Sequence, residues 1–99
     1  MNLQSFTERV QALVGTDSGL GASFKFATDE GVVVVDATKV PNVVSNVDAD
    51  TDCTLNMSLS DAVDMLNGDM NPMMAFMSGK LKVKGDMGVA MKIADKMNS

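Results

Sequence analysis

The sequence of residues 71–92, NPMMAFMSGKLKVKGDMGVAMK, predicts a helix, a strand and a second helix in succession. Asn71 suits the N-cap of the first helix and Pro72 its first position, and Gly79 should end that helix. In residues 80–84 three lysines alternate with two apolar residues, so the lysines point to one side of a strand. This strand must join a sheet built by the preceding residues.

The first half of the chain is rich in strand patterns. A helix with one apolar stripe covers residues 3–14, and residues 16–19 have turn chemistry. Two β-rich runs, residues 22–26 and 32–35, are joined by so short a turn that they favour an antiparallel hairpin. The four valines of the second run predict a strand covered on both faces. Residues 53–57 alternate apolar and polar side chains, as a half-buried strand does.

The remaining segments complete the order of elements. Residues 39–47 are ambiguous, because their valines favour a strand whereas Pro41 removes a ladder donor. Ser58 resembles a helix cap, and Gly68 suits the left-handed end of the same helix. The final helix follows residues 85–86. The helix after Ser58 is predicted to face inward with four residues: Leu59, Ala62, Val63 and Leu66.

This order predicts an α+β fold for a single domain of residues 1–99. We expect a five-stranded, mostly antiparallel sheet with helices covering one face. The final strand joins the sheet after a helical excursion, which allows a parallel crossover onto an otherwise antiparallel sheet.

Absent residue types narrow the function. The chain has no histidine, tryptophan or tyrosine, and Cys53 is its one cysteine. Nucleophile–histidine sites, zinc sites with histidine or several cysteines, and internal disulfides are therefore excluded. Thirteen acidic residues against eight basic ones give a net charge of −5, which argues against nucleic acid as a partner.

We expect no targeting signal in this chain. No apolar run is long enough to span a bilayer, and residues 1–10 lack a basic region followed by an apolar core. Residues 97–99 do not form a peroxisomal or endoplasmic-reticulum address. We therefore expect a cytoplasmic protein.

Methionine is unusually frequent in the second half of the chain. Ten of 99 residues are methionine, and nine of them lie at or after Met57. A rigid core favours Leu, Ile and Val, whereas unbranched thioethers suit an apolar surface that adapts to different shapes. The final helix also has more apolar circumference than one sheet contact needs, so a ligand, a partner or a membrane should cover the remainder. An apolar ligand cavity and a plain core are both consistent with this pattern.

Lysines and the cysteine have structural explanations beside functional ones. Lys80, Lys82 and Lys84 form a basic strip that is explained by a solvated strand face, which also discourages edge pairing. The functional alternative is contact with anionic lipid headgroups or with the phosphates of an acyl-CoA. Cys53 lies on the inward face of its strand, where a buried thiol behaves as a small hydrophobe.

Acidic residues form two groups, and neither predicts a catalytic or metal site. Residues 48–52 contain three aspartates but lack the glycine and the closing glutamate of a calcium-binding loop. Asp61 is explained by a helix N-terminus, and Asp64 falls among solvent-facing positions. Paired-carboxylate catalysis by these two residues and Asp69 is therefore not expected.

Short motifs between residues 52 and 92 match a known family. They are Asp52-Cys53-Thr54, Gly68, Met70-Asn71-Pro72, Ala75-Phe76, Gly79-Lys80-Leu81-Lys82, Gly85-Asp86-Met87-Gly88 and Ala90-Met91-Lys92. On these motifs the chain resembles the sterol carrier protein 2 domain family. The first fifty residues match that family in element order and in the strand Phe24-Lys25-Phe26.

The resemblance implies an apolar tunnel between the sheet and its helices. It implies non-catalytic binding and transfer of fatty acids, fatty acyl-CoAs, sterols or similar lipids, with no cofactor. The final helix, residues 86–97, is expected to move as a gate. The residues expected to line the tunnel are Phe24, Phe26, Met57, Leu66, Met73, Met74, Phe76, Met77, Met87, Val89, Met91 and Ile93.

Two other functions remain open. The domain could serve as an accessory module that presents a lipid to an enzyme complex of lipid or quinone synthesis, in which case the apolar face binds protein as well as lipid. Transient contact with a membrane surface is compatible with either function. An enzymatic activity is the third and least favoured interpretation.

Overall fold

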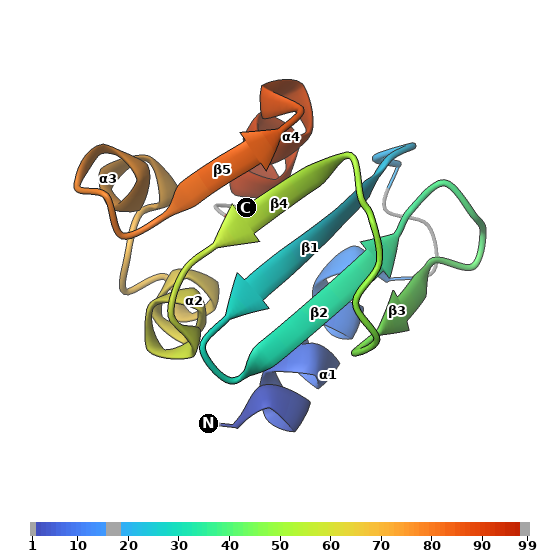
Figure 1. The fold of residues 1–99 in the computed structure, drawn as a ribbon, viewed down its shortest axis with the longest axis horizontal. Coiled ribbons are helices and arrows are strands. Elements are labelled where there is room, and N and C mark those ends of the chain that lie inside the picture. The colour runs from blue at the N-terminus through green and yellow to red at the C-terminus, as the bar shows by residue number, and fades with distance from the viewer. Residues whose placement is uncertain (1, 16–18, 98–99) are drawn as a thin grey trace.

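The computed structural model describes residues 2–15 and 19–97, so most of the turn predicted at residues 16–19 lies outside the described residues. Within these ranges, five strands form one sheet and four helices pack around it (Figure 1). In chain order the elements are α1 (Leu3–Val14), β1 (Ser23–Thr28), β2 (Gly31–Asp36), β3 (Val43–Ser45), β4 (Cys53–Asn56), α2 (Leu59–Asn67), α3 (Pro72–Met77), β5 (Lys82–Gly85) and α4 (Met87–Met97).

The strand order across the sheet is β3-β2-β1-β4-β5. β1 and β2 form the predicted antiparallel hairpin, with Phe24 opposite Val35 and Phe26 opposite Val33. β4 lies on the other side of β1 and runs parallel to it, with Phe26 opposite Leu55. β5 pairs antiparallel with β4 at the edge of the sheet. The predicted α+β class is confirmed, with one parallel pair among the described strands.

The crossover expected at the final strand occurs at β4 instead, so that prediction is wrong. Figure 1 shows the reason: α2 and α3 both lie at the end of the sheet where β4 ends, so β5 enters there and runs back along β4. Lys80 N and Leu81 N both donate to Ala75 O, at 2.9 and 3.0 Å, and hold this return. The parallel pairing is that of β4 with β1, and the segment between β3 and β4 carries the chain to it.

The helices cover the sheet face that carries Phe24 and Phe26 (Figure 1). These two side chains are 1% and 0% exposed. The Phe26 ring meets the Phe6 ring of α1 edge to face at 5.2 Å between centroids, and the Phe24 ring at 5.8 Å. Val33 and Val35 are fully buried beside them. This part of the core is closed and built from rigid side chains.

The opposite sheet face is covered in part by the segment between β3 and β4, which passes across β2 in Figure 1. Val34, whose cross-strand partner is Lys25, is 8% exposed, so the valine run is covered on both sides as predicted. Lys25 Nζ donates to Asp48 Oδ1 at 2.8 Å and to Ala49 O at 2.9 Å, which fastens the segment to β1. The same hydrogen bond, with the charge of Lys25, lowers the pKa of Asp48.

The predicted helix caps are confirmed. Ser58 Oγ accepts a hydrogen bond from Asp61 N at 3.1 Å, and Gly68 ends α2 in the left-handed region at φ 81°. Asn71 Oδ1 accepts from the backbone N–H two residues on at 2.8 Å, and Pro72 is the first residue of α3. Local sequence therefore determines where both helices begin.

The buried face of α2 is rotated from the predicted one. Leu59 and Ala62 are buried as expected, and Met65 joins them at 2% exposed. Val63 and Leu66 are only partly buried. The helix therefore faces the core with Leu59, Ala62 and Met65, which are spaced three residues apart. Val63 and Leu66 lie at the edge of its buried face.

Candidate functional site

Helix α3 turns its large apolar side chains outward. Its buried residues are Pro72 and Ala75, the two smallest side chains that it has. A helix that only packs on a sheet buries its large apolar side chains. Helix α3 instead leaves its large apolar side chains at the surface, where they are available to a ligand or a partner. The exposed fractions are 50% for Met73, 67% for Met74, 42% for Phe76 and 79% for Met77.

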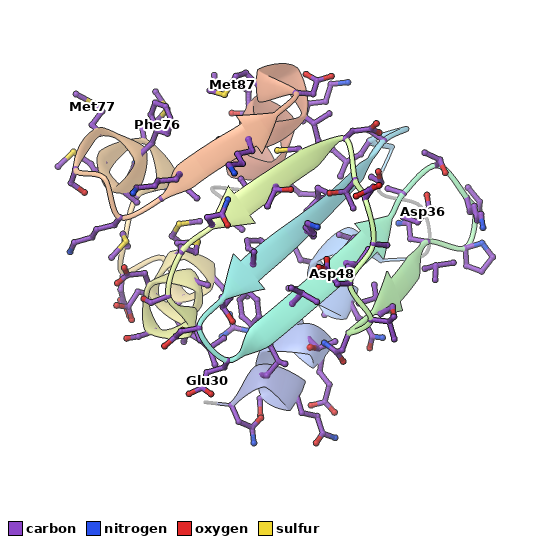
Figure 2. All side chains as sticks on the ribbon, in the orientation of Figure 1. Glu30, Asp36, Asp48, Phe76, Met77 and Met87 are labelled. Atoms are coloured by element: carbon purple, nitrogen blue, oxygen red, sulfur yellow. The ribbon has the colours of Figure 1, made fainter. Side chains whose placement is uncertain are left out.

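Met73 and Phe76 line a groove that runs between α3, β5 and α4. Figure 2 shows Phe76 on α3 and Met87 on α4 reaching to the same side of β5. The free volume of the groove is about 80 Å³. Its lining is apolar throughout and consists of Pro72, Met73, Phe76, Leu81, Val83, Met87, Ala90, Met91 and Ala94.

The groove is narrow for a lipid. Pockets for small-molecule ligands typically have volumes of roughly 300–1,000 Å³, against about 80 Å³ here. An acyl chain can therefore enter fully only if one wall moves outward. Helix α4 fully buries few side chains: Val89 and Ile93 are its buried residues, whereas Met87 and Met91 are 47% and 50% exposed.

The start of α4 is fixed to the sheet. Asp86 N donates to Asp52 O at 2.8 Å. Asp86 Oδ1 accepts from Gly88 N at 2.8 Å and from Val89 N at 3.3 Å, so it caps the helix. Gly85 has φ 93°, and a Cβ there would lie 2.4 Å from Asp52 O. Movement of the far end of α4 about this fixed start would widen the groove.

The residues predicted to line a tunnel fall into three groups. Those brought together by the groove are Met73, Phe76, Met87 and Met91. Those placed in the core between sheet and helices are Phe24, Phe26, Met57, Val89 and Ile93, with Leu66 partly buried against them. Met74 and Met77 lie outside both places. Met74 lines a separate depression with Met70 and Lys80. Met77 points away from the sheet in Figure 2.

Five groove residues are missing from the predicted set: Pro72, Leu81, Val83, Ala90 and Ala94. Two patterns in the sequence could have identified most of them. Leu81 and Val83 alternate with the lysines of the β5 segment, which places them on the apolar side of that strand. Ala90 and Ala94 share a helix face with the methionines of α4, because residues three and four apart are neighbours.

The described lining residues of the groove carry no titratable side chain, so they offer no group for acid–base or nucleophilic catalysis. The Cys53 thiol is fully buried. Burial raises its pKa, and the negative charges of Asp86 and Asp52 raise it further. A thiol held in the protonated form is a poor nucleophile. In residues 2–15 and 19–97 no three side chains of the metal-binding types are grouped to hold an ion.

The chain can be compared with known proteins on this basis. A model of the SCP-2 sterol transfer family matches residues 3–98. The chain belongs to this family. Sterol carrier protein 2 of Bos taurus is 40% identical to it over 81 residues, which are 75% of this chain and 15% of that protein. The chain thus spans about 15% of the length of such SCP-2 relatives.

Solved structures of SCP-2 family domains share the fold. The sterol carrier protein domain 2 of Helicoverpa armigera is 26% identical with a TM-score of 0.76, covering 96% of this chain and 84% of that one. The palmitated SCP2L2 of Aedes aegypti is 25% identical with a TM-score of 0.74, covering 100% of this chain and 96% of that one.

The SCP-2 membership gives the coarse function. The chain is a carrier domain of the sterol and lipid type. Such domains are typically non-catalytic, and their homologues include domains of larger proteins. None of the helices in the described part of the chain is long and apolar enough to cross a membrane.

Proposed function

We propose that this domain binds the hydrocarbon part of a fatty acid, a fatty acyl-CoA or a sterol-like lipid and carries it through the cytoplasm unchanged. The groove between α3, β5 and α4 carries the proposal, because its lining is apolar throughout and open to solvent. Each CH₂ group that leaves water for such a site contributes about 0.8 kcal/mol. The palmitated state of the Aedes aegypti relative supports an acyl chain as the ligand.

The proposed site extends from the groove toward the core. Met73, Phe76, Met87 and Met91 form its mouth. Val89 and Ile93, on the buried side of α4, would line the next part as the helix moves outward. The deepest part would be lined by Phe24, Phe26, Met57 and Leu66. Met74 and Met77 are left out of this site because they lie away from the groove.

Methionines at the mouth suit a carrier with broad specificity. A lipid that leaves a membrane starts in an apolar medium, so its transfer free energy nearly cancels and the quality of packing decides occupancy. Unbranched thioether side chains can repack around ligands of different shape. We therefore expect several acyl chain lengths to bind with similar affinity.

Met87→Asp tests the site directly. Met87 is the first residue of α4, where a carboxylate is favourable for the helix, so the fold should survive. The charge would stand in the apolar mouth and weaken binding of a fluorescent fatty acid more than tenfold. Fluorescence titration measures the binding, and circular dichroism checks the fold. Met91→Asp should act in the same way.

Met77→Asp is the matched control, because it makes the same change on a residue that is 79% exposed and outside the groove. This variant should bind the fatty acid like the wild type. Unchanged binding by Met87→Asp and Met91→Asp, with the folds intact, would exclude the groove as the ligand site.

A further inference from the structure

The outer surface of α3 is apolar but does not contribute to the groove. Met74 and Met77 are 67% and 79% exposed, and neither lines the space between α3 and α4. Figure 2 shows Met77 directed away from the sheet, further from α4 than Phe76 is. The proposed ligand site therefore leaves these two side chains without a role.

Charge is distributed unevenly around this surface. Residues 70–85 contain three lysines and no Asp or Glu, so all thirteen acidic residues of the chain lie elsewhere. Lys80, Lys82 and Lys84 are all exposed. A protein with a net charge of −5 thus has one corner that is locally positive. An anionic surface would repel the rest of the molecule and attract this corner, which fixes the orientation of approach.

The apolar and basic parts of this corner are held together. Ala75 O accepts hydrogen bonds from Lys80 N at 2.9 Å and from Leu81 N at 3.0 Å, so the end of α3 is tied to the chain that enters β5. Met74 and Lys80 line the same surface depression. The exposed Met74 side chain and Lys80 therefore lie beside each other at the point where α3 is tied to the chain that enters β5.

We propose that α3, with Met74 and Met77, and the basic strip of Lys80, Lys82 and Lys84 dock this domain on an anionic phospholipid bilayer. The methionines insert among the headgroups while the lysines contact lipid phosphates and carboxylates. Such docking holds α3, which is also one wall of the groove, against the membrane surface. The docking surface is separate from the proposed ligand site and does not depend on it.

A bilayer fits this corner better than a protein does. A helix of six residues is about 9 Å long and is too short to supply the roughly 800 Å² per partner that a specific protein complex usually buries. A second copy of the chain is unfavourable as well, because a two-fold contact would bring both basic strips together. A bilayer needs only a few inserted side chains and a positive rim.

Vesicle binding tests the proposal. The wild-type domain should co-sediment with vesicles of phosphatidylcholine containing 30% phosphatidylserine, about a hundredfold more strongly than with pure phosphatidylcholine, and 0.5 M salt should abolish the difference. The triple variant Lys80→Gln, Lys82→Gln, Lys84→Gln should lose about a hundredfold, at roughly fivefold per lysine. Met77→Asp should also weaken binding at least tenfold.

Lys39→Gln is the control for a single charge change, because Lys39 is exposed before β3 at the other edge of the sheet. It should bind vesicles like the wild type, whereas Lys82→Gln alone should lose about fivefold. Both the triple variant and Met77→Asp should still bind a fluorescent fatty acid in solution, which separates docking from ligand binding. Failure of the wild type to bind these vesicles, or wild-type vesicle binding by the triple variant, would overturn the proposal and leave an acidic protein as the alternative occupant.

Discussion

The two ends of this sheet are covered by different kinds of apolar side chain. Around α1, β1 and β2 the core consists of phenylalanine and valine, and Phe6, Phe26 and Val33 are all 0% exposed. Around α3, β5 and α4 the large apolar side chains are mostly methionine, and Met73 and Met91 are each 50% exposed. One end of the molecule is therefore closed and rigid, and the other is open and adaptable.

This contrast separates folding from binding within a small domain. Rings and branched side chains have few rotamers, so they define a unique packing and contribute most of the stability. Thioethers leave a groove that can open at little cost in stability. The proposed ligand site thus lies where the large apolar side chains are most exposed.

The largest expected effect compares one truncation at each end. Phe26→Ala should lower the free energy of unfolding by about 3–5 kcal/mol, because it removes a fully buried ring from the closed end. Met91→Ala should lower it by less than about 1 kcal/mol, since half of that side chain is already in water. Urea denaturation measures both. Equal losses would mean that the two ends are packed alike.

Gly85 joins the open end to the sheet, and substituting it has the next largest effect. Gly85→Ala should destabilise by roughly 2–3 kcal/mol, because φ is 93° and the new Cβ would meet Asp52 O at 2.4 Å. Gly68→Ala is the control, since φ is 81° but no atom lies within 4 Å. Gly68→Ala should lower the free energy of unfolding by about 1 kcal/mol. A loss as small for Gly85 as for Gly68 would argue against a fixed start of α4.

Removing the N-cap of α4 tests whether this helix controls the rate at which a ligand enters the groove. Asp86→Ala deletes the acceptor for Gly88 N and Val89 N, so it should destabilise by about 1 kcal/mol. Uptake of a fluorescent fatty acid should become faster in stopped-flow experiments, because α4 opens more often. Ser58→Ala removes a comparable cap from α2 and should leave the rate unchanged. The same rate in both variants would contradict the gating role of α4.

The smallest effect concerns the segment fastened by Lys25. The pKa of Asp48 is below its usual value in the folded state, so its ion pair stabilises the fold above about pH 4 and stops doing so as pH falls through the folded pKa. The effect is small because Asp48 is exposed. Asp48→Asn should therefore have a slightly lower Tm than the wild type at pH 6, and the gap should close once the pH is low enough to protonate Asp48 in the folded protein. A gap that is constant with pH would assign the difference to packing.

Local features of this fold could be predicted from the sequence because they depend on neighbouring residues. Caps such as Ser58 and Asn71 satisfy backbone groups two or three residues away. The hairpin of β1 and β2 follows from two alternating runs and a short turn. The methionine-rich half could likewise be recognised as an adaptable surface.

The remaining features depend on contacts distant in the chain. The direction of β5 is decided by where α3 ends, and that position is held by hydrogen bonds to Ala75 O. Helix periodicity could not show that α3 buries Ala75 and exposes Met77, because every side of that helix is apolar. The described residues form an open groove, and an enclosed tunnel stays a prediction that depends on movement of α4.

The most direct test uses the ten methionines as reporters. With ¹³C-labelled methionine methyl groups, titration with palmitate can be followed by NMR at each thioether once the signals are assigned by substitution. The account predicts that the methyl signals of Met73, Met87 and Met91 shift and saturate together, while those of Met74 and Met77 stay in place. Signals that do not respond to palmitate, or that respond only at Met74 and Met77, would contradict the proposed ligand site.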